Sequence, residues 1–241
     1  MDKNLNEAPG RKKTMAEITP VATIYTQFPS KFGIPRQSGL ADTAGKIVFN
    51  KDFRSIEAVR GMEGFSHLWL IWEFSENKNK SNALTVRPPR LGGNTRMGVF
   101  ATRSSFRPNN LGLSAVTIEK IDYECSDAPV IYVRGADILD GTPIFDIKPY
   151  LPFSDCIPEA KGGFADDVSG NNMNVVFPPE IINESDAEDI PLIREILSED
   201  PRPHYHNDPD RIYSFEFSSY KIKFTVKENT VYINEIKKLP L

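Results

Sequence analysis

The sequence is poor in cysteine and has no long apolar run, and each absence excludes a class of protein. Its 241 residues include two cysteines, Cys125 and Cys156, which are too few for a disulfide framework and lack metal-site spacing. No stretch of about 18 apolar residues occurs, so we expect no membrane-spanning helix. The first residues are polar and lack the apolar core of a secretory signal. We therefore expect a cytoplasmic protein in which residues 1–15 form a disordered tail.

Signatures of common nucleotide and metal enzymes are also missing. No G-x-G-x-x-G turn follows a strand, and there is no Walker loop. His67 lies in an apolar run, where a buried structural role is expected before a catalytic one. His204 and His206 flank Tyr205 without a supporting carboxylate pattern. We expect no bound metal.

Nineteen prolines and fifteen glycines predict many turns and short strands. No long amphipathic helix is predicted before Pro158, and residues 53–59 have only weak helical character. Short strands with glycine-rich connections favour a β-barrel or a sandwich over residues 16–160. The predicted strands are residues 16–28, 46–49, 65–74, 97–102, 113–121, 130–133 and 135–139.

The character of the chain changes after Pro158. Residues 161–178 are polar and predict a linker, and residues 179–199 predict a helix that Ser185 could cap. Alternating apolar residues then predict three short strands near residues 212–217, 222–226 and 231–233. Residues 179–241 should thus form a small α+β unit. A unit of roughly 60 residues is marginal alone, so we expect it to dock on the barrel.

Charge is distributed unevenly along the chain. The formal net charge is −4, but residues 77–118 contain seven basic residues and no acidic ones. Residues 155–200 contain twelve acidic residues and two basic ones. A local basic surface can meet a phosphate backbone although the whole protein is anionic, because the Debye length is only about 8 Å at physiological salt. The middle of the chain therefore remains a candidate for nucleic-acid binding.

The segment from Val86 to Leu113 is the main candidate functional segment. Its prolines fix the backbone and its glycines permit close approach, which is typical of a rigid binding loop. Arginine guanidinium groups suit phosphate and carboxylate recognition, although a solvated basic surface is the alternative. From the residues alone we predict an arginine-rich loop that binds an anion. The arginines of the segment are Arg87, Arg90, Arg96, Arg103 and Arg107.

Two later segments also carry polar groups. Asp137, Asp140 and Asp146 surround a D-G turn, which turn chemistry explains by itself, but which would also suit a cationic ligand. The segment D-P-R-P-H-Y, from Asp200 to Tyr205, is stiffened by two prolines just past the predicted helix. A helix stop needs none of its polar groups, so this segment is a second candidate.

Five segments follow one another in a recognisable order. They are G-I-P-R-Q-S-G-L (33–40), A-V-R-G-M-E-G-F-S-H-L-W-L (58–70), T-V-R-P-P-R-L-G-G-N-T-R-M-G-V-F-A-T-R-S-S-F-R-P-N-N-L-G-L-S (85–114), D-I-L-D-G-T-P-I-F-D-I-K-P-Y-L-P-F (137–153) and D-P-R-P-H-Y (200–205). Together they resemble the TsaA/TrmO family over nearly the whole chain from about residue 17. The resemblance implies a tRNA methyltransferase that uses S-adenosyl-L-methionine (SAM) to methylate N6 of threonylcarbamoyl-adenosine at position 37 of the anticodon loop. It also implies a homodimer and a single-sheeted β-barrel that binds SAM without a Rossmann fold, followed by the small α+β unit.

The resemblance also implies a set of SAM-contacting residues. Ser75 and Glu76 stand where similar sequences carry His-Gln, and Asn110 replaces the second proline of an R-P-N-P motif, so we expect a looser turn there. The residues carried over for SAM are Pro35, Arg36, Gln37, Ser75, Glu76, Arg103, Leu113, Ile138, Leu139, Asp140 and Gly141.

The remaining polar residues are left for RNA and for proton transfer. Asp200 or Tyr205 could orient or accept the proton of the target nitrogen. Phe106 and Tyr205 could stack on splayed bases of the RNA loop. A non-catalytic module that binds RNA or an anionic metabolite through the same loop is the alternative function. The arginines left for RNA, or for structural ion pairs, are Arg87, Arg90, Arg96 and Arg107.

Overall fold

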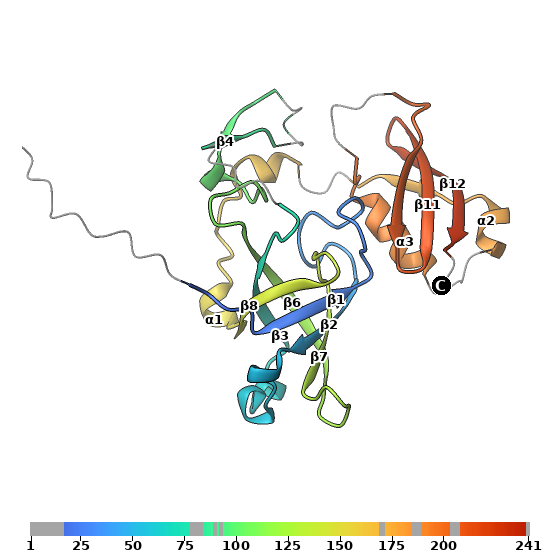
Figure 1. The fold of residues 1–241 in the computed structure, drawn as a ribbon. Coiled ribbons are helices and arrows are strands. Elements are labelled where there is room, and N and C mark those ends of the chain that lie inside the picture. Colours follow the sequence, from blue (N-terminus) through green and yellow to red (C-terminus); the bar gives the residue numbers. More distant parts are fainter. Residues whose placement is uncertain are drawn as a thin grey trace, which may run out of the picture.

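The computed structural model describes residues 17–77, 84–88, 91, 94–168, 172–184, 189–202 and 208–239. This part of the chain forms a closed six-stranded barrel, a four-stranded sheet and a two-stranded ribbon (Figure 1). The predicted mainly β fold, a barrel followed by a small α+β unit, is confirmed. The predicted tail of residues 1–15 lies outside the described residues. No described helix is long and apolar enough to cross a membrane.

The barrel is a single sheet in the order β1-β2-β7-β6-β3-β8, and its strands pair antiparallel. Successive strand residues point to opposite faces, so Leu68, Leu70 and Trp72 of β3 enter the core. Gly112 of β6 makes room for the Trp72 indole, because a Cβ there would lie 2.3 Å from the ring. The barrel strands are β1 (Ala22–Thr26), β2 (Ala44–Phe49), β3 (His67–Glu73), β6 (Leu111–Asp122), β7 (Val130–Arg134) and β8 (Thr142–Pro149).

Two predicted strands are wrong. Residues 135–139 are not a strand. Two of their backbone oxygens accept from side chains and not from the backbone of a neighbouring strand: Thr43 Oγ1 donates to Ala136 O, and Thr26 Oγ1 donates to Ile138 O. The sixth barrel strand is β8, just beyond them. The predicted strand 97–102 shrinks to the two residues of β5, followed by a 3₁₀ turn. The ribbon consists of β4 (Thr85–Val86) and β5 (Met97–Gly98).

Other boundaries also differ from the predictions. The first strand covers Ala22–Thr26 instead of residues 16–28. The weakly helical region forms two short 3₁₀ turns, Lys51–Phe53 and Ile56–Val59. The short helix α1 (Pro152–Asp155) follows the barrel.

The C-terminal unit is a sheet in the order β10-β11-β12-β9 with two helices. The predicted strand triplet is confirmed, and its last turn falls at Glu228–Asn229. The predicted helix 179–199 is two helices, separated by residues that include Ser185 and lie outside the described part. The predicted linker contains a strand, β9, which pairs in parallel with β12. The elements are β9 (Asn174–Val176), α2 (Pro179–Glu184), α3 (Ile190–Ser198), β10 (Tyr213–Phe217), β11 (Tyr220–Lys227) and β12 (Thr230–Lys238).

The loop between β1 and β2 joins the two units. Figure 1 shows it leaving the barrel toward α3. Phe28 and Ala41 are buried in the C-terminal hydrophobic core, and Phe32 and Ile34 pack against it. Gly33 has φ +100°, and a Cβ there would lie 2.3 Å from the Phe215 ring. The close approach therefore requires glycine at the start of the G-I-P-R-Q motif.

Candidate functional site

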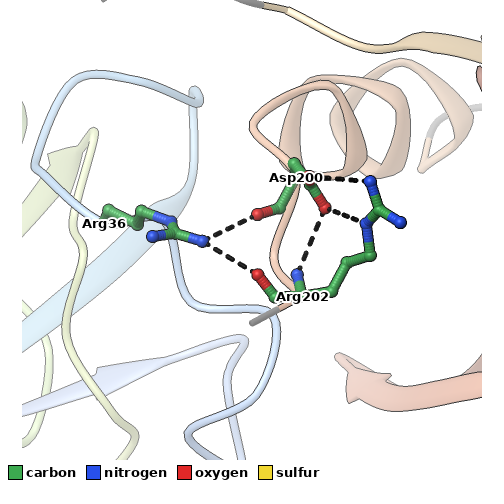
Figure 2. A network of polar contacts seen from close by, with 3 residues as sticks. All are labelled: Arg36, Asp200 and Arg202. Carbon is green, nitrogen blue, oxygen red and sulfur yellow. Dashed lines mark hydrogen bonds and ion pairs between the residues drawn. The ribbon is translucent and has the colours of Figure 1, made fainter. Parts of the chain in front are cut away.

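The P-R-Q segment, residues 35–37, lies where the loop between β1 and β2 meets the C-terminal unit. Figure 2 shows the Arg36 guanidinium between two backbone carbonyls of the D-P-R segment. Its Nη2 donates to Asp200 O at 3.0 Å and to Arg202 O at 3.1 Å. Pro35 is buried, and the Gln37 side chain donates to Arg36 O. Two motifs that are 164 residues apart in the sequence thus form one polar junction.

Asp200 and Arg202 form an ion pair inside their own turn (Figure 2). The Asp200 carboxylate accepts from Arg202 Nε at 2.8 Å and from Nη2 at 3.2 Å. Asp200 is buried and has φ +47°, in the left-handed region that asparagine and aspartate tolerate best among non-glycine residues. Its carboxylate is therefore held by a guanidinium from the same segment. Tyr205, the other predicted catalytic residue, lies outside the described residues.

Arg103 connects the arginine segment to the P-R-Q loop. Its Nη1 donates to Gln37 Oε1. Nearby, the Ser38 hydroxyl accepts from the backbone N–H of Ala115 on β6 at 3.2 Å. The structure therefore brings Arg36, Gln37 and Arg103 together, as expected for residues of one site.

Asp137 lies beneath this junction. Its carboxylate accepts from Ser114 Oγ at 2.5 Å, and Ser114 Oγ accepts from Trp72 Nε1 at 2.9 Å. Burial raises the pKa of Asp137, while the Ser114 hydrogen bond, backbone amides and the nearby Arg103 charge oppose the rise. The sequence indicated Asp137 only as one of three aspartates around the D-G turn that would suit a cationic ligand.

The D-I-L-D-G turn is fastened to the end of β1. The Asp140 carboxylate accepts from the backbone N–H of Thr26 at 2.8 Å, and the Gly141 N–H donates to Ile24 O at 3.0 Å. The Ile138 side chain is fully buried in the barrel core. Only the backbone of Ile138 could therefore face a ligand, whereas Asp140 and Gly141 are exposed.

Leu113 lies on the outer face of β6 and is 56% exposed, which leaves an apolar surface open for a ligand. Ser75 and Glu76 follow β3 and are exposed as well.

Asn77 is a positioning residue that sequence analysis missed. Its Nδ2 donates to Ser105 O at 2.7 Å, and its Oδ1 accepts from Lys31 Nζ at 3.1 Å. It therefore connects the β1–β2 loop to the arginine segment. A lone asparagine after a strand is typical of turns, so the sequence carried no signal for this role.

The turn at Asn110 is not loosened, contrary to our expectation. Asn110 is buried, its N–H donates to Arg107 O at 3.2 Å, and its carbonyl accepts from the Phe74 N–H at 2.8 Å. Its side chain donates to Asn77 O at 3.3 Å. Its φ of +48° is forbidden to proline, so the asparagine suits the turn found here.

The other arginines differ in their surroundings. Arg107 is half-buried and donates to Thr102 O at 3.1 Å, so it orders its own loop. Arg96 donates weakly to Thr85 Oγ1 at 3.4 Å and is exposed, as is Arg87. Arg90 lies outside the described residues. Phe106, the predicted stacking residue, is 55% exposed.

A cavity of about 550 Å³ adjoins the junction, between the β1–β2 loop, β6 and α3. Ser38, Ala115 and Glu195 are among its lining residues. His67 also lines it and is exposed, so the predicted buried role of His67 is wrong. Within the described ranges, no group of three or more His, Cys, Asp or Glu side chains could hold a metal ion.

The fold and the junction define a class: a single-sheet β-barrel whose arginine-rich loop meets a polar site shared with a C-terminal unit. Two family models match the chain, the tRNA-methyltransferase O N-terminal domain over residues 23–156 and the TrmO C-terminal domain over residues 171–239. The chain therefore belongs to the TrmO family. This finding confirms the resemblance that the sequence motifs indicated.

Similar proteins match over most of their length. The tRNA (adenine(37)-N6)-methyltransferase of Escherichia coli is 36% identical over 217 residues, covering 86% of this chain and 92% of the relative. A putative S-adenosylmethionine-dependent methyltransferase of Pseudomonas aeruginosa is 38% identical over 205 residues, covering 81% and 86%. The crystal structure of TrmO from Pseudomonas aeruginosa matches with a TM-score of 0.74 at 27% identity, covering 93% and 100%.

Proposed function

We propose that this protein is a SAM-dependent tRNA methyltransferase that methylates N6 of adenosine 37. The observation that carries the proposal is the junction of the P-R-Q loop, Arg103 and the D-P-R segment in a chain of the TrmO family. A relative of that name matches 86% of the chain. The alternative of a non-catalytic binding module is not favoured, because the relatives are methyltransferases.

The residues of the junction fit a cofactor that has a carboxylate, a cationic centre and apolar surface. Gln37 and Arg103 offer donors, Asp140 offers negative charge, and Leu113 offers exposed apolar surface. SAM, when bound, supplies an electrophilic methyl group on a sulfonium. We assign SAM binding to these groups and to the backbone of residues 35–37 and 138–141.

The arginine segment supports the RNA half of the proposal. Arg87 and Arg96 are exposed and free of nearby acidic residues in the sequence, which suits phosphates of an anticodon loop. The exposed Phe106 ring is placed to stack on an unpaired base. We further propose that the substrate adenosine carries threonylcarbamoyl at N6, whose carboxylate a guanidinium could bind in a bidentate manner.

Methyl transfer requires that the two reactants are held in line and shielded from water, and only modest help with one proton. Asp200 is already bound by Arg202, so we propose that it orients the D-P-R segment. Tyr205 stays the sequence-based candidate for accepting the proton. The homodimer and the cytoplasmic location also stay predictions from the resemblance.

The test is mass spectrometry of nucleosides from tRNA incubated with the protein and SAM. The tRNA is taken from a strain that lacks the endogenous enzyme. We expect threonylcarbamoyl-adenosine to decrease and its N-methyl form to appear, and we expect Arg103→Ala to prevent this. An unchanged nucleoside profile with wild-type protein would contradict the proposal. A thermal shift with SAM at 100 times its Kd, about 2.7 kcal/mol, checks cofactor binding separately.

A further inference from the structure

Asp137 is a half-buried carboxylate at the proposed cofactor site that the proposed function does not use. It follows β7 and a glycine turn, and the Ser114 hydroxyl donates to it at 2.5 Å. Ser114 is itself fully buried and is oriented by the Trp72 indole N–H. Desolvation of a carboxylate costs stability even when a hydroxyl donates to it, which makes Asp137 a candidate functional residue.

Hydrogen bonds, together with the charge of Arg103, link Asp137 to the P-R-Q-S loop in a closed set of interactions, which we call the ring. Ser114 and Ala115 are consecutive on β6: the first holds Asp137 and the second holds the Ser38 hydroxyl at 3.2 Å. Arg103 donates to Gln37, the neighbour of Ser38, and its charge also acts on Asp137. The ring therefore runs from Asp137 through β6 to the P-R-Q-S loop and back through Arg103.

Two backbone contacts bring the same segments together from another side. The Gly39 N–H donates to Gly135 O at 2.9 Å, and the Gly135 N–H donates to Thr43 O at 2.8 Å. A Cβ at Gly135 would come within 3.3 Å of the Gly39 backbone. The stretch that carries Asp137 is thus packed directly against the loop that carries Gln37 and Ser38.

The negative charge of Asp137 acts on the arginine segment. The arginine segment has no acidic residue of its own between positions 77 and 118, so Asp137 supplies a negative charge to Arg103 from the segment that follows β7. Arg103 is exposed and donates to Gln37, and a long side chain of this kind loses rotamer entropy when it is held against a ligand. The attraction between the Arg103 charge and the half-buried Asp137 reduces that loss.

We infer that Asp137 is a positioning residue for cofactor binding, which acts through Ser114 and Arg103 to hold the P-R-Q-S loop in its binding conformation. The inference rests on the proposed function, because it takes the loop as the SAM site. It goes beyond that function, since Asp137 itself need not touch the cofactor.

The first test compares Asp137→Asn with Asp127→Asn, a surface aspartate paired with Arg54. Asparagine keeps the shape and the acceptor for Ser114 but removes the charge. We expect the KM for SAM to rise about tenfold or more in Asp137→Asn, the loss expected for one charged partner, with kcat changed far less. The affinity for tRNA and the melting temperature should stay near wild type, and Asp127→Asn should match wild type throughout.

The second test needs no cofactor. Amide hydrogen exchange of the full chain without SAM should be faster in residues 36–40 of Asp137→Asn and of Ser114→Ala, and unchanged in Asp127→Asn. Unchanged exchange together with unchanged KM for SAM in a folded Asp137→Asn would overturn the inference alone. Wild-type protein that neither binds SAM nor methylates tRNA would instead overturn the proposed function, while faster exchange would still support the ring.

Discussion

The two hydrophobic cores of this molecule are built in different ways. Among the described residues, the barrel core consists of residues from the barrel strands and their connections. The C-terminal core combines its own sheet and helices with Phe28 and Ala41 from the loop between β1 and β2. The described barrel core thus takes no residue from the C-terminal unit, while the C-terminal core includes a piece of the N-terminal third of the chain. That piece carries the P-R-Q loop, so the proposed cofactor site depends on both cores.

The largest expected effect comes from Phe28→Ala. Phe28 is fully buried and packs on Phe217 at a ring distance of 5.3 Å, so truncation should cost about 3–5 kcal/mol of unfolding free energy. Both tryptophans lie on β3 and report on the barrel. We expect faster hydrogen exchange in residues 213–238 at denaturant concentrations where tryptophan fluorescence is unchanged. If hydrogen exchange and tryptophan fluorescence instead changed at the same denaturant concentrations, the two cores would unfold as one unit.

Arg36→Gln should have the next largest effect. It removes a guanidinium that donates to two carbonyls of the D-P-R segment, and charged hydrogen bonds contribute about 1.5–3 kcal/mol. Chemical denaturation followed by circular dichroism should show the loss. Arg60→Gln, at an exposed 3₁₀ turn, is the control and should stay within about 0.5 kcal/mol of wild type. Equal stability of the two variants would mean that Arg36 does not hold the C-terminal segment.

Gly33→Ala and Gly39→Ala form a matched pair. Both glycines have positive φ, so both variants lose about 1–2 kcal/mol to backbone strain. Only a Cβ at Gly33 meets an obstacle, the Phe215 ring, whereas none lies within 4 Å of one at Gly39. We expect an additional loss of about 1–3 kcal/mol for Gly33→Ala by denaturant titration. Equal losses would place the loop farther from the C-terminal core than described.

The smallest effect concerns pH. Burial raises the pKa of Asp137 in the folded state, so between its unfolded and folded pKa the native protein binds more protons than the unfolded chain. Stability contributed by this group therefore falls as pH rises through that window. Wild type should lose stability relative to Asp137→Asn as pH increases through the acidic range, measured as the difference between their melting curves. A difference that is independent of pH would contradict the raised pKa.

The sequence predicted those elements that form a continuous apolar run or whose apolar residues alternate. The strand β3 is nearly a continuous apolar run, the C-terminal strands β10 to β12 follow period two, and each was located within a few residues. The strand β8 was missed because Pro143, Asp146 and Lys148 interrupt its apolar pattern. The pairing of β8 with β1 closes the barrel and decides which β8 side chains face the core. That pairing depends on the whole sheet and cannot be read from the segment alone.

The site was predicted as a set of motifs, and its geometry was not. Motif resemblance selected Arg36 and Asp200, but their separation of 164 residues concealed the contact between them. Asn77, Ser38 and Ser114 were missed because serine and asparagine are common in turns and strands, and only their partners reveal their roles. The charge pattern located the arginine segment, yet it could not separate Arg107, which orders its own loop, from the exposed Arg87.

The central claim is that this chain transfers the methyl group of SAM to adenosine 37 of tRNA. The most direct measurement is single-turnover transfer from methyl-labelled SAM to threonylcarbamoylated tRNA, beside the same tRNA with guanosine at position 37. The account predicts label in the first tRNA and none in the second. Equal labelling of both, or no label in either, would contradict it.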